Sequence, residues 1–182
     1  AAFDLERGGC FLSIDHGLVE ASGKLKTFRT LFYPCSEETL KRVHSANYIK
    51  NVKNKTLYAN IIKKIGFPLV DSVVQRSFIA TGGTVLASKL AINSGLACNT
   101  AGGSHHASFN EGAGFCVFND VAVAAKYLTT RGLANRILII DLDVHQGNGN
   151  SEIFKNDNYV NKSCSFQQIY ITLFRKWFQN TL

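Results

Sequence analysis

The stretch Arg136-Ile-Leu-Ile-Ile-Asp-Leu-Asp-Val-His145 joins an apolar run to a set of polar side chains. The nearly continuous apolar run over 136–142 is typical of a central parallel strand that is covered on both faces. Because alternate residues of extended backbone point the same way, Asp141, Asp143 and His145 are expected to converge at the end of this strand. Carboxylates and imidazoles are good ligands for a divalent metal such as zinc. We therefore predict a metal site there, and favour it over a helix-capping Asp141 beside an ordinary loop histidine.

The chain before this strand predicts an α/β arrangement. Residues 1–35 give weak signals and are left unassigned. Apolar periodicity and capping residues predict a helix over 37–53, a shorter helix within 56–71 that ends near Gly66-Phe67-Pro68, and a helix over 73–93 with Gly95 as its stop. They also predict a short strand over 96–100 and a helix from 120 to 131 capped by Asn119. The order strand, loop, helix, strand predicts a three-layer α/β/α fold with a mainly parallel sheet. Ligands of such sheets bind beyond the carboxyl ends of the strands, where the loop over 101–118 also lies.

Composition and charge exclude several classes of protein. The chain has 182 residues, of which 46% are hydrophobic and 18% charged, as in one globular domain. No apolar run reaches the roughly 18 residues that span a bilayer, so we expect no membrane association. The net charge of +7 comes from scattered basic residues, so we expect no direct nucleic-acid binding. Five cysteines without a CxxC pair favour reduced thiols and a cytoplasmic location, or a nuclear one in a eukaryote.

A second group of polar residues, Gly102-Gly103-Ser104-His105-His106, lies on the predicted loop. Paired histidines can act as general acid and base because imidazole titrates near neutral pH. The alternative is a surface loop with two solvated histidines, and the pair alone does not decide between them. The acid–base interpretation gains weight because the loop lies at the same sheet edge as the metal cluster.

A third group follows at 112–120, where glycines lie beside aromatic residues. Phe118 is best explained as a core residue that anchors the next helix, whereas chemistry alone leaves Phe115 open between core and ligand contact. Cys116 could be a nucleophile with a histidine as base. A small buried cysteine is the commoner case, and we prefer that interpretation.

Together these groups resemble the histone deacetylase superfamily, which has the arginase/deacetylase fold. The matching strings are Ala-Gly-Gly-Ser-His-His-Ala over 101–107, Glu-Gly-Ala-Gly-Phe-Cys-Val-Phe-Asn-Asp-Val over 111–121, and Ile-Asp-Leu-Asp-Val-His-Gln-Gly-Asn-Gly over 140–149. Val43-His44-Ser45 upstream also looks like the family's early helix. The details are most similar to the bacterial and class IV-like branch, and the likeness runs from about Pro34 to Val160.

The resemblance implies a metal centre at the end of the strand. Asp143 and His145 match two of the family's three zinc ligands. Asp141 matches the carboxylate that orients the first histidine and helps to hold a structural potassium ion. The implied cofactors are therefore Zn²⁺ and a K⁺ ion near Asp141.

The resemblance also assigns roles in amide hydrolysis. His106 matches the general base, and His105 matches the neighbouring acid or electrostatic catalyst. Asn148 matches the residue that orients the second histidine, where some relatives have Asp; unlike Asp, it adds no negative charge to raise the basicity of the imidazole. Gly114 and Phe115 match positions that line the acetyl-lysine channel.

The C-terminal part of the sequence departs from the family. The family takes its third zinc ligand, an Asp, together with a catalytic Tyr and a glycine-rich loop, from the second half of its domain. After Asp157 this sequence contains no Asp, Glu or His. Tyr159 and Tyr170 lack the family's glycine-rich context. We therefore predict an N-terminal part of a deacetylase catalytic domain over 1–160, incomplete at the C-terminus, and a divergent tail over 161–182.

These features lead to three expectations about function. The first is a zinc-dependent deacetylase that acts on acetylated lysine in proteins or on a small acetylamine, and that is impaired because the third ligand is absent. The second is an inactive remnant that binds acetyl-lysine or a partner without turnover. The third is an acetylpolyamine or acetoin-related deacetylase, which differs from the first only in substrate. The arginase branch of the fold is disfavoured because it uses two manganese ions with a richer set of Asp and His residues.

Overall fold

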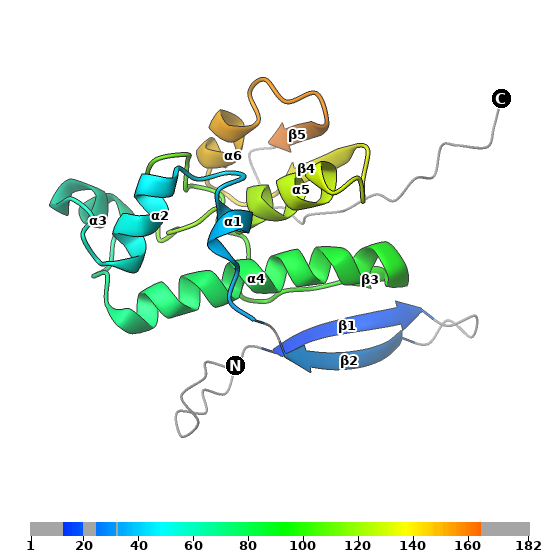
Figure 1. Ribbon diagram of the computed structural model, residues 1–182. Helices are drawn as coiled ribbons and strands as arrows, with labels where there is room; N and C mark the ends of the chain where they lie inside the picture. The colour runs from blue at the N-terminus through cyan, green and yellow to red at the C-terminus, as the bar shows by residue number, and fades with distance from the viewer. Residues whose placement is uncertain (1–12, 20–24, 32, 165–182) are drawn as a thin grey trace.

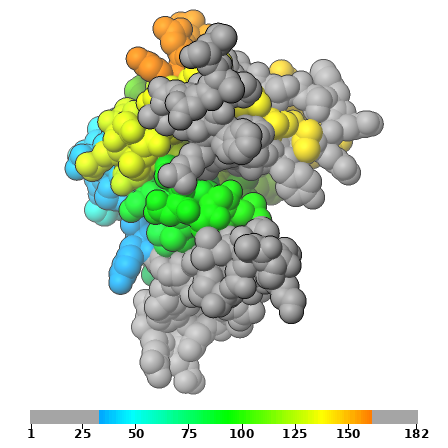
Figure 2. Space-filling model, turned by 90° about the vertical axis from the view of Figure 1, so that its right-hand side faces the viewer, coloured from blue at the N-terminus to red at the C-terminus, as the bar shows by residue number. Residues whose placement is uncertain are grey.

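A long helix, α4 (Asp71–Ser94), runs through the middle of the fold (Figure 1). The computed structural model describes residues 13–19, 25–31 and 33–164. The hairpin of β1 (Ser13–Val19) and β2 (Leu25–Leu31) lies on one side of α4. On the other side lies α5 (Asp120–Thr130), which packs directly against α4, and Figure 2 shows the two as adjacent layers. Helix α4 therefore separates the hairpin from the part of the chain that carries the predicted site.

The helix predicted over 37–53 is divided into α1 (Glu37–Leu40) and α2 (Ala46–Lys53), so a single helix was the wrong prediction. The break comes from Ser45, whose extended backbone makes it the N-cap of α2. Its side chain accepts a hydrogen bond from the Tyr48 amide at 3.2 Å, and its own amide donates to the Phe109 carbonyl at 2.9 Å. Both hydrogen bonds compete with the continuous helix that periodicity alone predicts.

The predicted helix ends agree with the structure. Helix α3 (Ala59–Ile65) ends at Gly66 and α4 ends at Gly95, and both glycines have the left-handed backbone that favours glycine at a helix C-terminus. Asn119 caps α5 by accepting a hydrogen bond from the Ala122 amide at 2.9 Å. The predicted stop at Gly95 and the predicted cap at Asn119 are therefore confirmed.

The strands pair differently from the prediction. Strand β3 (Gly95–Ala97) pairs antiparallel with β1, which gives a three-stranded sheet in the order β2-β1-β3. The one parallel pair in the described part of the chain joins β4 (Ile137–Asp141) to β5 (Val160–Cys164). The short strand expected over 96–100 thus does not join the parallel sheet.

The physical reason lies at Asn99, which ends the extended stretch. The Asn99 side-chain amide donates to the Ala80 carbonyl at 3.0 Å and to the Thr84 hydroxyl at 2.8 Å. Both acceptors belong to α4, so the chain turns back toward this helix directly after β3. A polar side chain that satisfies helix groups in this way gives no periodic signal in the sequence.

The hydrophobic core of the part that carries the predicted site lies between α2, α4, α5 and β4. Phe118 is 2% exposed, and its ring contacts the rings of His44, Tyr48 and Phe78. The core role predicted for Phe118 is therefore confirmed. Alternate residues of β4, beginning with Ile137, are buried, and those between them are half-buried. No helix in the described ranges is long and apolar enough to cross a membrane.

Candidate active site

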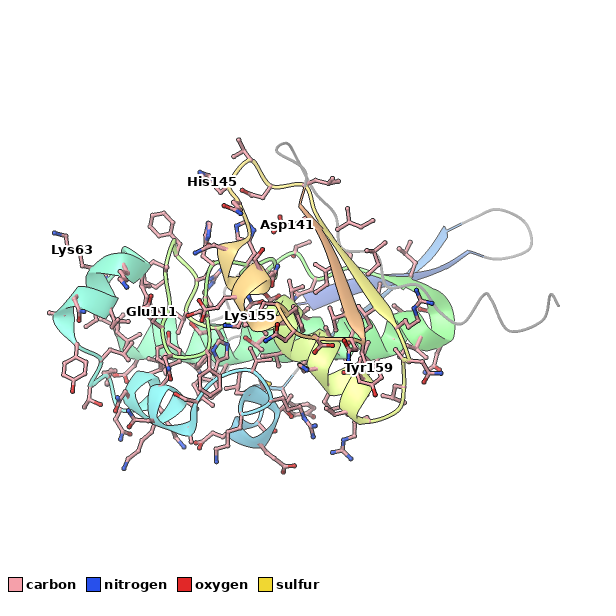
Figure 3. The ribbon with its side chains drawn as sticks, turned by 90° about the horizontal axis from the view of Figure 1, so that it is seen from above. Lys63, Glu111, Asp141, His145, Lys155 and Tyr159 are labelled. Atoms are coloured by element: carbon pink, nitrogen blue, oxygen red, sulfur yellow. The ribbon has the colours of Figure 1, made fainter. Side chains whose placement is uncertain are left out.

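The three metal-type residues lie together after β4. Asp141 is buried, and its Oδ1 accepts a hydrogen bond from the Asp143 amide at 3.3 Å. Oδ1 of Asp143 accepts from the His145 amide at 2.7 Å and lies 2.9 Å from Nδ1 of the same histidine. The His145 amide and then the His145 ring lower the pKa of Asp143. Figure 3 shows Asp141 and His145 at the same end of the strand pair, where the sequence predicted the site.

Asp143 and His145 provide two donors that fit one zinc ion. Tetrahedral zinc with ligands at about 2.0–2.1 Å places two ligand atoms roughly 3.3 Å apart, so the 2.9 Å pair has to open by a few tenths of an ångström. Both side chains are largely exposed and free to make this adjustment. Within residues 33–160, no group of three or more His, Cys, Asp or Glu side chains is arranged to hold a metal ion. The ligand roles of Asp143 and His145 stay a prediction.

Each of the paired histidines has its own hydrogen-bond acceptor. Nδ1 of His105 donates to Oδ2 of Asp141 at 2.7 Å, and this contact is buried. Nδ1 of His106 donates to Oδ1 of Asn148 at 2.6 Å on the exposed side. The two imidazole centroids are 4.1 Å apart, and that of His106 is 6.1 Å from that of His145. Because each Nδ1–H is used, each neutral ring presents Nε2 as its free acceptor.

Gly147 and Gly149 allow this close packing. A Cβ atom at Gly147 would lie 2.0 Å from Oδ2 of Asp141, and one at Gly149 would lie 2.4 Å from the Ala107 carbonyl oxygen. Neither glycine has a positive φ. Glycine is needed at these positions because the missing Cβ leaves room for the carboxylate and the histidine loop.

Gly114 packs against the half-buried His106, and Phe115 follows it in the loop. Both have a positive φ, and a Cβ at Gly114 would lie 2.4 Å from Cδ2 of His106. Their amides donate to the carbonyls of Lys64 and Ile65 at 2.9 and 2.8 Å, which ties this loop to the end of α3. Phe115 is 70% exposed and stacks on Phe67, so it is not a core residue. The structure thus places Gly114 against the His106 imidazole, with Phe115 as the next residue of the loop.

Cys116 is buried in the same loop, as the sequence favoured. Burial raises the pKa of its thiol. A thiol held in the neutral form is a poor nucleophile, because the thiolate is the reactive species. This environment disfavours covalent catalysis by Cys116.

A cavity lies beside His105. It has a volume of about 660 Å³ and separates β3 and α4 from α5 and β4. His105, Asp141 and Asp143 reach it, whereas His106, His145 and Phe115 do not line it. His106 and the loop that carries Gly114 and Phe115 thus lie outside this cavity.

Sequence reasoning missed two buried residues that hold the site. His44 is 1% exposed; its Nδ1 donates to the Ser108 carbonyl at 2.8 Å, and its Nε2 accepts from the Asn119 amide at 3.0 Å. Asp120 accepts hydrogen bonds from the amides of Gly103 and Ser104. An acidic residue in the first turn of a helix usually indicates only a favourable charge, so this contact has no signal in the sequence.

The C-terminal residues add no group to the site within the described range. Tyr159 is 61% exposed and lies at the end of the β4–β5 pair opposite to Asp141 (Figure 3). Residues 161–164 belong to β5, while Tyr170 and the rest of the predicted tail lie outside the described residues. The domain boundary at 160 stays a prediction.

Comparisons with known proteins agree with this arrangement. The family described as "Histone deacetylase domain" matches residues 12–172. An uncharacterised protein of Picosynechococcus is 50% identical over 121 residues, which cover 66% of this chain and 40% of the relative. Histone deacetylase 2 of Arabidopsis thaliana is 33% identical over 167 residues, which cover 87% of this chain and 42% of the relative. The chain thus spans about two-fifths of the length of these two relatives.

Solved structures give the same assignment. The crystal structure of an HDAC homolog from Aquifex aeolicus superposes with a TM-score of 0.63 and is 31% identical; the match covers 72% of this chain and 37% of that one. The same values hold for an HDAC homolog complexed with SAHA. Since the family match covers most of the sequence, the chain belongs to the histone deacetylase family.

Proposed function

We propose that this chain is the N-terminal part of a zinc-dependent deacetylase that hydrolyses the amide of acetylated lysine. The observation that carries the proposal is the convergence of two histidine pairs, His105–Asp141 and His106–Asn148, on the Asp143–His145 pair. General acid–base groups beside metal-type ligands are what metal-assisted amide hydrolysis requires. We further propose that the complete domain has the mainly parallel sheet of the fold, of which β4 and β5 are one pair.

The two histidines are suited to different proton transfers. His106 has a neutral partner, Asn148, and presents Nε2 as the base that takes a proton from the attacking water. His105 has a carboxylate partner, Asp141, which orients its ring, and we assign to His105 the transfer of a proton to the leaving amine. Zinc held by Asp143, His145 and a third ligand would supply a Lewis acid and lower the pKa of bound water toward about 7.

The loop at Gly114 and Phe115 is proposed to guide the substrate. Phe115 presents a largely exposed ring that stacks on Phe67, and the adjacent Gly114 leaves room for the His106 imidazole. An aromatic face is suited to the aliphatic stem of an acetyl-lysine or a small acetylamine. A protein-bound lysine and a free acetylpolyamine share this chemistry, so both remain candidate substrates.

Two further parts of the proposal concern ions and location. Both carboxylate oxygens of Asp141 accept hydrogen bonds, so a potassium ion there would use their remaining lone pairs and neighbouring carbonyls. Cys35, Cys98 and Cys116 are free thiols, which supports a reducing cytoplasmic or nuclear location.

A second candidate function, binding without turnover, is favoured by one observation. Two donors are brought together in the described residues, whereas catalytic zinc sites normally have three protein ligands. The 182-residue chain is therefore expected to show little or no hydrolysis of an acetyl-lysine peptide. The two functions are separated by joining residues 1–160 to the remaining part of the Aquifex aeolicus homologue.

We expect the joined protein to hydrolyse an acetyl-lysine peptide and to lose activity when a zinc chelator is added. His106→Ala in the same protein should abolish hydrolysis, whereas Glu38→Gln, which changes an exposed carboxylate far along the chain, should not. A folded joined protein whose activity is unaffected by His106→Ala would contradict the proposed role of this histidine.

A further inference from the structure

The carboxylate of Asp120 is buried beneath the histidine loop. Asp120 is 1% exposed and is the first residue of α5. Its Oδ1 accepts from the Ser104 amide at 2.7 Å, and its Oδ2 accepts from the Gly103 amide at 3.1 Å and from the Thr84 hydroxyl. One carboxylate thus joins α5, α4 and the loop.

The surroundings of Asp120 suit an acceptor of several hydrogen bonds. The Thr84 hydroxyl accepts from the Asn99 side-chain amide at 2.8 Å, so its own hydrogen is available to Asp120. A Cβ at Gly102 would lie 2.5 Å from Oδ2 of Asp120, so the loop closes around the carboxylate only because this residue is glycine. In the described part of the chain, no basic side chain forms an ion pair with Asp120. The N-terminus of α5 provides the favourable field instead.

The clamped backbone leads directly into the two histidines. His105 follows Ser104, and its carbonyl accepts from the Asn150 amide at 3.2 Å. Farther along, the Ala107 carbonyl accepts from the Asn119 side-chain amide at 3.1 Å. The loop is therefore fixed before the histidines by Asp120 and after them by the residue that precedes Asp120. Its position is set largely by the first turn of α5.

We propose that Asp120 is a positioning residue for the histidine pair. By fixing the amides of Gly103 and Ser104, it sets the backbone from which the His105 ring reaches Asp141. The relevance to catalysis rests on the proposed deacetylase function, whereas the positioning itself is a property of the folded chain. Charged hydrogen bonds of this kind are strong and directional, which suits them to holding a catalytic group in place.

The test uses NMR of the 182-residue chain and needs no activity. The Nδ1 proton of His105, hydrogen-bonded to Asp141, should give a downfield signal that is assigned by its loss in His105→Gln. Asp120→Asn keeps the shape but turns an NH₂ group toward a backbone amide donor. We expect the His105 signal to disappear. We also expect hydrogen exchange of the Ser104 amide to become about tenfold faster, which is the size of a lost charged hydrogen bond. Glu38→Gln makes the same chemical change at an exposed position and should alter neither.

A role in stability alone would give a different result. Exchange would then accelerate across α5 as a whole while the His105 signal kept its position in the folded fraction. That outcome, or an unchanged Ser104 amide in folded Asp120→Asn, would overturn the proposal. Failure of hydrolysis in the joined protein would leave these spectra unaffected, so the two proposals fail separately.

A second pair of variants covers the case in which Asp120→Asn does not fold. Thr84→Val removes one donor to the carboxylate, and Thr84→Ser retains the hydroxyl. We expect Thr84→Val to shift the His105 signal and accelerate Ser104 exchange, and Thr84→Ser to resemble the unmodified chain. Identical spectra for Thr84→Val and the unmodified chain would overturn the proposal.

Discussion

The buried histidine at position 44 makes stability depend on pH. Burial lowers the pKa of His44 from its ordinary 6.5 to about 4, against a smaller opposite effect of the Ser108 carbonyl. Above pH 6.5 the ring is neutral in both the folded and unfolded states, so its full contribution to stability is present. Between pH 6.5 and 4 the unfolded state binds a proton that the folded state does not. The free energy of unfolding therefore decreases as the pH is lowered through this range.

The size of the effect follows from the two pKa values. At about 1.4 kcal/mol per pH unit, the interval from 6.5 to about 4 corresponds to a total loss of about 3 kcal/mol. About 2 kcal/mol of this should be lost between pH 7 and pH 4.5. This is a large share of the stability of a typical small domain.

The assay is urea unfolding followed by far-ultraviolet circular dichroism at several pH values. His44→Gln removes the titrating ring. This variant should be less stable than the unmodified chain at pH 7, and its stability should lack the pH dependence that His44 causes. His145→Gln changes a largely exposed histidine and should retain that dependence. Equal pH dependence of the unmodified chain and His44→Gln from pH 7 to 4.5 would refute the reasoning.

Two other substitutions test how the site is held. Gly147→Ala places a Cβ 2.0 Å from Oδ2 of Asp141 and should lower the free energy of unfolding in urea by roughly 1–3 kcal/mol. Because the φ of Gly147 is −71°, alanine adopts this backbone without strain, and an unchanged free energy of unfolding would exclude close packing as the reason for the glycine. Lys64→Ala removes an ion pair with Glu111 that is about half-exposed, so thermal unfolding should show a decrease in the free energy of unfolding of less than about 1 kcal/mol. A decrease of several kcal/mol would mean that this pair anchors the Phe115 loop.

Local signals in the sequence accounted for much of the fold. The cap at Asn119 and the stop at Gly95 were predictable because each depends on one residue and its immediate neighbours. The end of β4 was predictable because strand periodicity places Asp141, Asp143 and His145 in alternation. The contact between Asp143 and His145 follows from this alternation. The contact between His105 and Asp141 was expected from two loops at one sheet edge, whereas β3 and β4 belong to different sheets and the contact forms between them.

Features that depend on distant partners were not predictable. The break at Ser45 requires the Phe109 carbonyl, and the turn at Asn99 requires acceptors on α4. Asp120 looks like any acidic residue at a helix start until the loop folds over it. Pairing of β3 with β1 likewise depends on a hairpin in a region whose sequence gave weak signals.

Zinc binding by the 182-residue chain tests the central claim most directly, because it reports on the site without requiring turnover. Competition with a chromophoric chelator should show one weakly bound zinc ion per chain. Asp143→Asn and His145→Ala should each lower the affinity by about tenfold or more, since even groups around a metal's ligands have effects of this size. Glu38→Gln should leave the affinity unchanged. Zinc affinity that is the same in all four proteins would contradict the assignment of a metal site to the end of β4.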